Sequence, residues 1–269
     1  MLRFIYSLFT FVASFVFSTL WGQTIDYQPD IDGDECITVI DLTSLLSQFG
    51  NCNNSVDSSS FVCGDFVSYN GFNYGTTQIG NQCWFTENLR TSTFNDGEPI
   101  EYIADDNLWN SGTPAYCYYL NLEVFASEYG YLYNGHTLTT THEICPSGWH
   151  VPTETEFSEL ELFLGVPVSE IDDINWRGVD TDIADVLKSD STDSPPWNGN
   201  NSTNFSAIPA GARNASFFNG VGELTRFWTN TYYIGADHWY RMLSSNNTGI
   251  YRRFMNRREA MSIRCIRDY

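Results

Sequence analysis

Hydrophobic and polar positions alternate over short distances along most of this chain. From residue 62 onward, apolar and aromatic residues come in short runs that Gly, Asn and Pro interrupt, a pattern typical of short strands joined by turns. The pattern predicts strands at residues 74–79, 82–87, 115–119, 227–229, 238–243, 250–254 and 262–266. The turn sequence Asn-Asn-Thr-Gly at 246–249 predicts a hairpin between two of these strands.

Two segments have the apolar spacing of helices. Thr153 and Glu156 have the spacing of a capping box, which predicts a helix start directly after Thr153. This helix is expected over residues 154–164, with an apolar face formed by Phe157, Leu160 and Leu164. A second helix is expected near residues 181–188, with an apolar face formed by Ile183, Val186 and Leu187.

An almost uncharged apolar run opens the chain. It follows Arg3 and ends among small residues near Gly22, which is the pattern of a secretory signal peptide over residues 1–22. Because the run is close to the length that spans a bilayer, an uncleaved membrane anchor is the alternative. We expect signal cleavage and a secreted protein, either extracellular or at the cell surface, with no membrane contact after cleavage.

Carboxylates recur at fixed intervals in residues 30–41. A loop starting at Asp30 has acids at its positions 1, 3, 5 and 12, and its position 7 offers a backbone carbonyl. The predicted ligands are Asp30, Asp32, Asp34, Cys36 and Asp41. Hard oxygen ligands at this spacing suit Ca²⁺, and the alternative is a polar turn that carries acids by chance.

The segment 24–52 resembles a dockerin repeat, in which a calcium loop is followed by a single helix. The apolar stripe after the loop consists of Leu42, Leu45, Leu46 and Phe49, and the segment ends beyond Gly50. Dockerins carry two such repeats and bind cohesin. Since only one repeat is present here, the resemblance argues against cohesin binding.

Charge and cysteines narrow the function class. The formal net charge of −20 disfavours nucleic acid and anionic membranes as partners. Seven cysteines follow the apolar run, and in an exported protein they are expected to pair. Their positions favour the pairs Cys36–Cys52, Cys63–Cys83 and Cys145–Cys265, with Cys117 left as a buried thiol, although spacing does not dictate connectivity.

The C-terminal part is the basic exception in this acidic chain. From residue 227 onward it carries the arginines 241, 252, 253, 257, 258, 264 and 267. We expect these arginines to face carboxylates of the acidic body across the fold, and an anion-binding site is the alternative.

Residues 62–269, which follow a polar linker at 53–61, resemble the Fibrobacter succinogenes major paralogous domain. The motifs that carry the resemblance are residues 63–90, 128–134, 145–157, 204–213, 227–229, 239–241 and 262–268. Such domains occur in exported bacterial proteins beside other modules, and the family has no established biochemical activity.

The domain also has a more distant similarity to the formylglycine-generating-enzyme class of C-type lectin-like folds. Three motifs carry it: the helix start at 151–157, the strand and Gly-x-Arg at 204–213, and the closing Arg-Cys-Ile-Arg. It implies an α+β, C-type lectin-like domain with two helices, short twisted antiparallel sheets and long loops, preceded by a small calcium loop-helix. The enzyme of that class uses a pair of cysteines near its C-terminus with copper. Only Cys265 lies there, so the resemblance does not extend to this chemistry.

No catalytic motif stands out in the remaining residues. The four histidines are scattered, and His150 is expected to pack or to bond the backbone. Trp84, Trp149, Trp228 and Trp239 lie beside apolar neighbours and are expected in the core. Three other tryptophans lie in polar, loop-like segments, where exposed rings beside polar groups suit sugar binding: Trp109, Trp176 and Trp197.

The sequence therefore favours a secreted, non-enzymatic module that binds glycan or protein at the cell surface or on extracellular polysaccharide. One alternative is a structural or adhesive surface component without a small-ligand site. The other is a degenerate enzyme related to the formylglycine-generating class.

Overall fold

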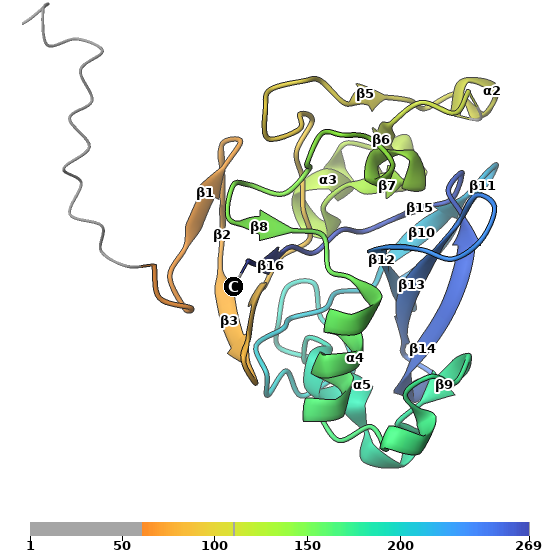
Figure 1. The fold of residues 1–269 in the computed structure, drawn as a ribbon. Coiled ribbons are helices and arrows are strands. Elements are labelled where there is room, and N and C mark those ends of the chain that lie inside the picture. The colour runs from red at the N-terminus through yellow and green to blue at the C-terminus, as the bar shows by residue number, and fades with distance from the viewer. Residues whose placement is uncertain (1–60, 110, 269) are drawn as a thin grey trace, which may run out of the picture. The chain divides into compact units, whose positions relative to one another are not determined.

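The computed structural model of this chain describes residues 61–109 and 111–268, which are mostly β-structure (Figure 1). The strands form sheets of ten, four and two strands. The described residues also include four α-helices, the longest of ten residues. The predicted α+β, C-type lectin-like fold with two helices is therefore wrong. It failed because many of the strands have only two or three residues, too few for a sequence pattern to register.

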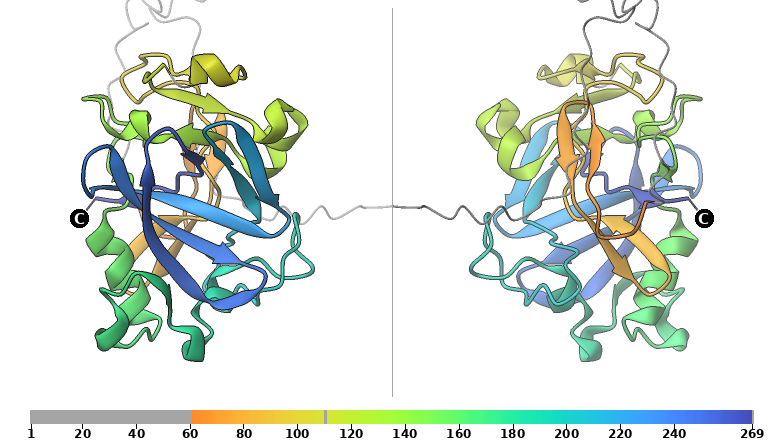
Figure 2. Two further views of the ribbon diagram at one scale, coloured as in Figure 1. Left: turned by 90° about the vertical axis from the view of Figure 1, so that its right-hand side faces the viewer. Right: turned by 90° about the vertical axis from the view of Figure 1, so that its left-hand side faces the viewer.

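The ten-stranded sheet has the order β5-β6-β7-β15-β10-β12-β13-β14-β9, with β11 paired to β10. Its strands are β5 (Glu101–Tyr102), β6 (Ala115–Cys117), β7 (Leu132–Asn134), β9 (Asn175–Arg177), β10 (Ala210–Asn214), β11 (Phe217–Val221), β12 (Leu224–Tyr232), β13 (Asp237–Ser244), β14 (Asn247–Asn256) and β15 (Ala260–Met261). The three long strands β12, β13 and β14 face the viewer in the left view of Figure 2. The predicted hairpin joins β13 to β14, but its turn is at residues 245–246 and not at 246–249, because Asn247 already pairs with Ser244.

The four-stranded sheet has the order β3-β4-β16-β8, and a separate hairpin pairs β1 with β2. These strands are β1 (Val67–Tyr69), β2 (Phe72–Tyr74), β3 (Thr76–Ile79), β4 (Gln82–Phe85), β8 (Trp149–His150) and β16 (Ile266–Arg267). The strand predicted at 262–266 is instead an extended, buried connection from β15 in one sheet to β16 in the other. Its carbonyls at Ile263 and Cys265 accept from the backbone of Leu89 and Phe85, so it joins the two sheets without pairing as one strand.

The helices are short and lie between the strands. They are α2 (Asp106–Trp109), α3 (Val124–Tyr129), α4 (Glu154–Phe163) and α5 (Ile183–Leu187), with single 3-10 turns η1 (Tyr119–Asn121), η2 (Gly135–Leu138), η3 (Val168–Glu170) and η4 (Val179–Thr181). Helix α4 begins as predicted, because the Thr153 side chain accepts from the Glu156 N–H while the Glu156 carboxylate accepts from the Thr153 N–H. Phe157 and Leu160 lie on the buried face of this helix.

Buried charges fix α4 against the ten-stranded sheet. Arg241 on β13 donates to Glu161 at 2.5 Å and to Glu154 at 2.7 Å. Arg177 also pairs with Glu161, and Arg252 pairs with Glu154. Of the seven C-terminal arginines expected to face carboxylates, Arg241 and Arg252 do so within the described residues, whereas Arg253, Arg264 and Arg267 donate to neutral groups. Burial opposes the charge on Arg241, but the two glutamates outweigh it and raise the pKa of that guanidinium.

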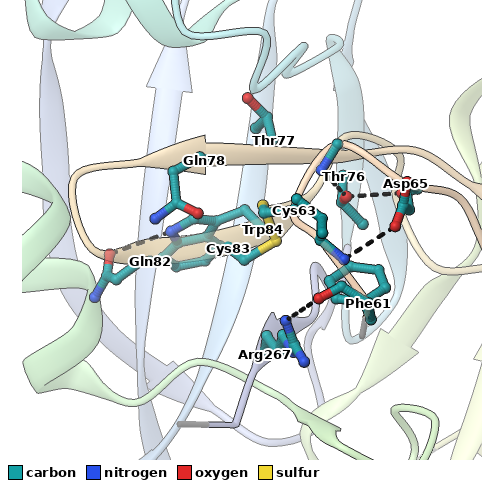
Figure 3. Close-up of a disulfide and its surroundings, with 12 residues drawn as sticks. Phe61, Cys63, Asp65, Thr76, Thr77, Gln78, Gln82, Cys83, Trp84 and Arg267 are labelled. Carbon is teal, nitrogen blue, oxygen red and sulfur yellow. Dashed lines mark hydrogen bonds between the residues drawn. A yellow bond between two sulfur atoms is a disulfide. The ribbon is translucent and has the colours of Figure 1, made fainter. Parts of the chain in front are cut away.

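Two of the three predicted disulfides are confirmed. Cys63 bonds Cys83 of β4, and Figure 3 places this bond close to Trp84. Cys145, ahead of β8, bonds Cys265 next to β16 across a sequence separation of 120 residues. Cys117 is free and buried, as predicted, and burial raises the pKa of its thiol to about 12. That thiol stays protonated and unreactive at neutral pH.

Several predictions fall outside the described residues. These are the signal peptide at 1–22, the calcium loop with Asp30, Asp32, Asp34, Cys36 and Asp41, the Cys36–Cys52 disulfide and nearly all of the linker at 53–61. Within the described part of the chain, no helix is long and apolar enough to cross a membrane.

Candidate functional site

A polar cleft of about 280 Å³ opens where three segments of the chain meet. The first follows β4, the second is the C-terminal end of α3, and the third is the long loop between α5 and β10. The polar side chains that line the cleft are Thr86, Glu87, Asn88, Arg90, Ser127, Glu128, Tyr129, Ser189, Asp193, Ser194 and Ser206. The cleft therefore offers hydroxyl, amide, carboxylate and guanidinium groups over a short distance.

Asn88 forms a fixed part of the lining. Its amide nitrogen donates to the Tyr129 carbonyl at 3.0 Å and to the Ser262 hydroxyl at 3.2 Å. Its amide oxygen accepts from Arg264 at 2.9 Å. Gly130, which ends α3, has a φ of 79°, and a Cβ there would lie 2.8 Å from the Asn88 Cβ. A glycine is required because the end of α3 approaches Asn88 so closely.

Arg264 places a positive charge behind this lining. The side chain is fully buried, and its guanidinium lies 4.4 Å from the centre of the Phe205 ring and 5.3 Å from that of the Phe227 ring. It donates to backbone carbonyls as well as to Asn88. Burial lowers the pKa of Arg264 to about 9. Unlike Arg241, it has no carboxylate within salt-bridge distance among the described residues. The cleft thus has a cation beneath it and carboxylates at its edge.

Two of the three carboxylates that line the cleft, Glu87 and Asp193, are held by hydrogen bonds. Glu87 accepts from the Gly75 N–H at 2.8 Å and from the Thr86 hydroxyl at 2.9 Å. Asp193 accepts from the Asp190 N–H at 2.8 Å and from a side-chain amide of the same loop. Such bonds fix the orientation of both carboxylates, which suits acceptors for ligand hydroxyls.

Arg90 forms one side of the cleft. Its guanidinium lies 4.5 Å from the centre of the Phe72 ring and donates to the Ser127 carbonyl at 3.1 Å. Its Nε atom is buried and has no hydrogen-bond partner. Because the Nε atom is buried, a ligand in the cleft would reach Arg90 through the terminal nitrogens of its guanidinium.

The structure does not bring the three candidate sugar-binding tryptophans together. Trp109 is buried at the end of α2, where its Nε1 donates to the Arg258 carbonyl at 2.7 Å and the Arg213 guanidinium covers its ring. Trp197 is also buried, in a different core cluster. The expectation that these two rings are exposed is wrong, because neighbouring arginine, lysine and apolar groups cover them despite the polar sequence around them.

Trp176 is the exception among the three. It lies on β9, is partly exposed, and packs edge-on against Tyr251 with ring centres 5.0 Å apart. It does not line the cleft. The tryptophans expected in the core are all buried, namely Trp84, Trp149, Trp228 and Trp239.

The histidines take structural positions away from the cleft. His150 differs from expectation, because its ring bonds the carboxylates of Glu156 and Asp268 instead of the backbone. His136 and His238 are buried, and burial lowers the pKa of both. Among the described residues there is no group of three or more His, Cys, Asp or Glu side chains that could hold a metal ion.

Sequence reasoning missed the cleft because its lining comes from residues that are far apart in the chain. A signal was present, since three of the motifs that carry the family resemblance, at 63–90, 128–134 and 204–213, contribute residues to the lining. Nothing in their spacing relates them to one another.

Fold and cleft together define a mostly β, disulfide-linked domain with a polar ligand-sized cleft. The chain belongs to the Fibrobacter succinogenes major domain family, which matches residues 77–267. No curated protein and no solved structure matches the chain.

Proposed function

We propose that this protein is a secreted, non-enzymatic module that binds glycan through the cleft between β4, α3 and the loop after α5. The observation that carries the proposal is the lining itself, in which donors and acceptors of both charge signs surround a small opening. Sugar hydroxyls both donate and accept, so they match a mixed lining of this kind. Sites for drug-like ligands are instead lined mainly by hydrophobic and aromatic side chains.

The size of the cleft supports recognition of a small part of a glycan. Its volume of about 280 Å³ lies just below the usual range for small-molecule sites, about 300–1,000 Å³. The cleft therefore takes a short stretch of a glycan and leaves the remainder outside. Secretion is supported by the signal-peptide pattern of residues 1–22 and by the two disulfides, which suit an oxidising compartment.

A binding role is favoured over catalysis by the state of the cleft carboxylates. Glu87 and Asp193 are already engaged by backbone and side-chain donors. The lining, as described, includes neither histidine nor cysteine. Nucleophilic or general acid–base chemistry needs a group that is free to exchange a proton with the substrate.

The test is a glycan array probed with the full mature chain, followed by titration of the best ligand. Arg90→Ala and Glu128→Ala should each weaken binding about tenfold or more, because a hydrogen bond to a charged group contributes about 1.5–3 kcal/mol. Arg258→Ala is the control, since Arg258 is exposed and does not line the cleft. Absence of glycan binding, or equal losses in the control, would reject the proposal; capture of a surface protein alone would favour the adhesive alternative.

We further propose, from the sequence, that residues 30–41 bind Ca²⁺. Titration of the full mature chain with CaCl₂ in a calorimeter should show saturable binding. Asp30→Ala combined with Asp32→Ala removes two of the proposed ligands and should abolish it. Calcium binding that persists in the double variant, or is absent from the wild type, would contradict this site.

A further inference from the structure

Four tyrosines form an aromatic cluster on the strands β5, β6 and β7 and the residues beside them, in which Tyr102 is exposed, Tyr118 and Tyr131 are partly exposed and Tyr116 is buried. We call Tyr102, Tyr116, Tyr118 and Tyr131 the tyrosine face. Tyr102 stacks on Tyr118 with ring centres 4.9 Å apart, and Tyr116 stacks on Tyr131 at 4.8 Å. Strand pairing sets the arrangement, because Tyr102 of β5 lies opposite Tyr116 of β6.

The hydroxyl groups of the tyrosine face lie close together. The Tyr118 ring lies 5.9 Å from the Tyr116 ring and 5.2 Å from the Tyr131 ring, and burial together with the nearby Tyr118 raises the pKa of both phenols. Tyr102 donates to the Asn121 carbonyl at 3.4 Å. The face therefore combines ring edges with a row of neutral donors and acceptors.

The tyrosine face continues directly from the cleft. Residues 127–130 line the cleft and Tyr131 follows them in the chain. Arg90 also belongs to the cleft lining, and its charge acts on Tyr131. The Tyr131 N–H donates to the Leu89 carbonyl at 3.1 Å, which holds Tyr131 beside the cleft-lining residues Asn88 and Arg90.

An exposed, strained turn borders the tyrosine face. Leu120 and Asn121 have positive φ angles of 53° and 57°, and Leu120 is 51% exposed. A left-handed conformation is unfavourable for leucine, and this side chain gains little burial within the fold. The turn is held in place by the Asn121 side chain, which donates to the Ala104 carbonyl at 3.2 Å. Strained exposed residues of this kind concentrate at ligand-binding surfaces.

The charge around the two surfaces selects the class of ligand. Glu101, Glu123 and Glu128 are exposed, and the charge of Glu123 acts on Tyr102 and Tyr131. Acidic polymers would be repelled by these carboxylates. A neutral chain of sugars would not be repelled, and it offers both apolar C–H surfaces and hydroxyls to the tyrosines.

We propose that the tyrosine face extends the cleft, so that the protein binds a linear, neutral polysaccharide along several sugar units. This inference rests on the proposed glycan-binding function of the cleft. It assigns the cleft to one part of the chain of sugars and the four tyrosines to the units that follow.

The experiment compares ligands of two lengths. The probes are linear, neutral glucan, xylan, mannan and galactan oligosaccharides, each as disaccharide and hexasaccharide, titrated into the full mature chain. The wild type should bind the hexasaccharide of at least one series about tenfold or more tightly than the disaccharide. The double variant Tyr102→Ala, Tyr118→Ala should lose this gain and keep its disaccharide affinity. Tyr232→Ala is the matched control, because Tyr232 is exposed and lies outside the face.

The outcomes separate the two proposals. Disaccharide binding with no gain for the hexasaccharide, or a gain that survives in the double variant, overturns the extended site and leaves the cleft intact. No binding at either length overturns the function of the cleft itself. The variant Tyr118→Phe keeps the stacked ring and removes the hydroxyl. If the double alanine variant does not fold, a folded Tyr118→Phe protein that loses part of the hexasaccharide's advantage over the disaccharide supports the extended site.

Discussion

His150 joins two distant parts of the domain through its two ring nitrogens. Nε2 lies 2.8 Å from the Glu156 carboxylate, which also caps α4, and Nδ1 lies 2.5 Å from Asp268 beyond β16. The hydrogen bond with Glu156 and that with Asp268 outweigh the effect of burial and raise the pKa of His150 to about 9. The charged imidazole is therefore part of the folded structure at neutral pH.

This pairing predicts a loss of stability in mild alkali. A histidine whose pKa is raised on folding contributes fully below its unfolded value of 6.5, and the contribution disappears as the pH rises through about 9. Because the three side chains are partly exposed, we expect about 1–2 kcal/mol, less than the full shift implies. Urea unfolding of wild type and His150→Gln from pH 6 to pH 10 measures it. The stability difference between the two proteins should shrink as pH rises, and a constant difference would contradict the assignment.

Helix α4 depends on both a local signal and a buried charge network. The capping box and the apolar spacing place its start, but its packing against β9, β13 and β14 depends on Glu154 and Glu161. Glu161 is fully buried between Arg177 and Arg241. Removing its charge would leave two buried guanidinium groups near each other with only Glu154 to compensate them.

Glu161→Gln should therefore destabilise the domain by about 3–5 kcal/mol, the usual loss when one partner of a buried ion pair is removed. The matched control is Glu159→Gln on the same helix, where the side chain is exposed and a loss below about 0.5 kcal/mol is expected. Chemical denaturation of the two variants provides the comparison. Similar stabilities for both would mean that the network contributes little to holding α4.

Elements with a strong local signal were predictable, and those built from distant residues were not. Helix α4 follows from its capping box and the β13–β14 hairpin from a nearby turn signal, while the positions of the cysteines favoured the Cys63–Cys83 and Cys145–Cys265 bonds without dictating them. The short strands β5 and β15 exist only because neighbouring strands pair with them. The cleft and the tyrosine face combine segments far apart in the sequence, so spacing could not reveal either.

At the scale of the whole molecule, three of the C-terminal arginines of this acidic chain are buried inside the fold. Arg241 and Arg252 neutralise glutamates of α4, while Arg264 lies behind the cleft. This arrangement leaves an acidic, hydroxyl-rich outer surface around the cleft and the tyrosine face, which suits a neutral hydroxylated ligand. Two of the three tryptophans that the sequence favoured for sugar binding, Trp109 and Trp197, are buried in the core instead.

The most direct test of this account is a crystal structure of the full mature chain with the tightest oligosaccharide from the array. The account predicts a sugar unit in the cleft, with its hydroxyls within hydrogen-bond distance of Asn88, Arg90 or Glu128, and with further units along the tyrosine face. A sugar bound at another surface, for example against Trp176, with the cleft empty would contradict the central claim.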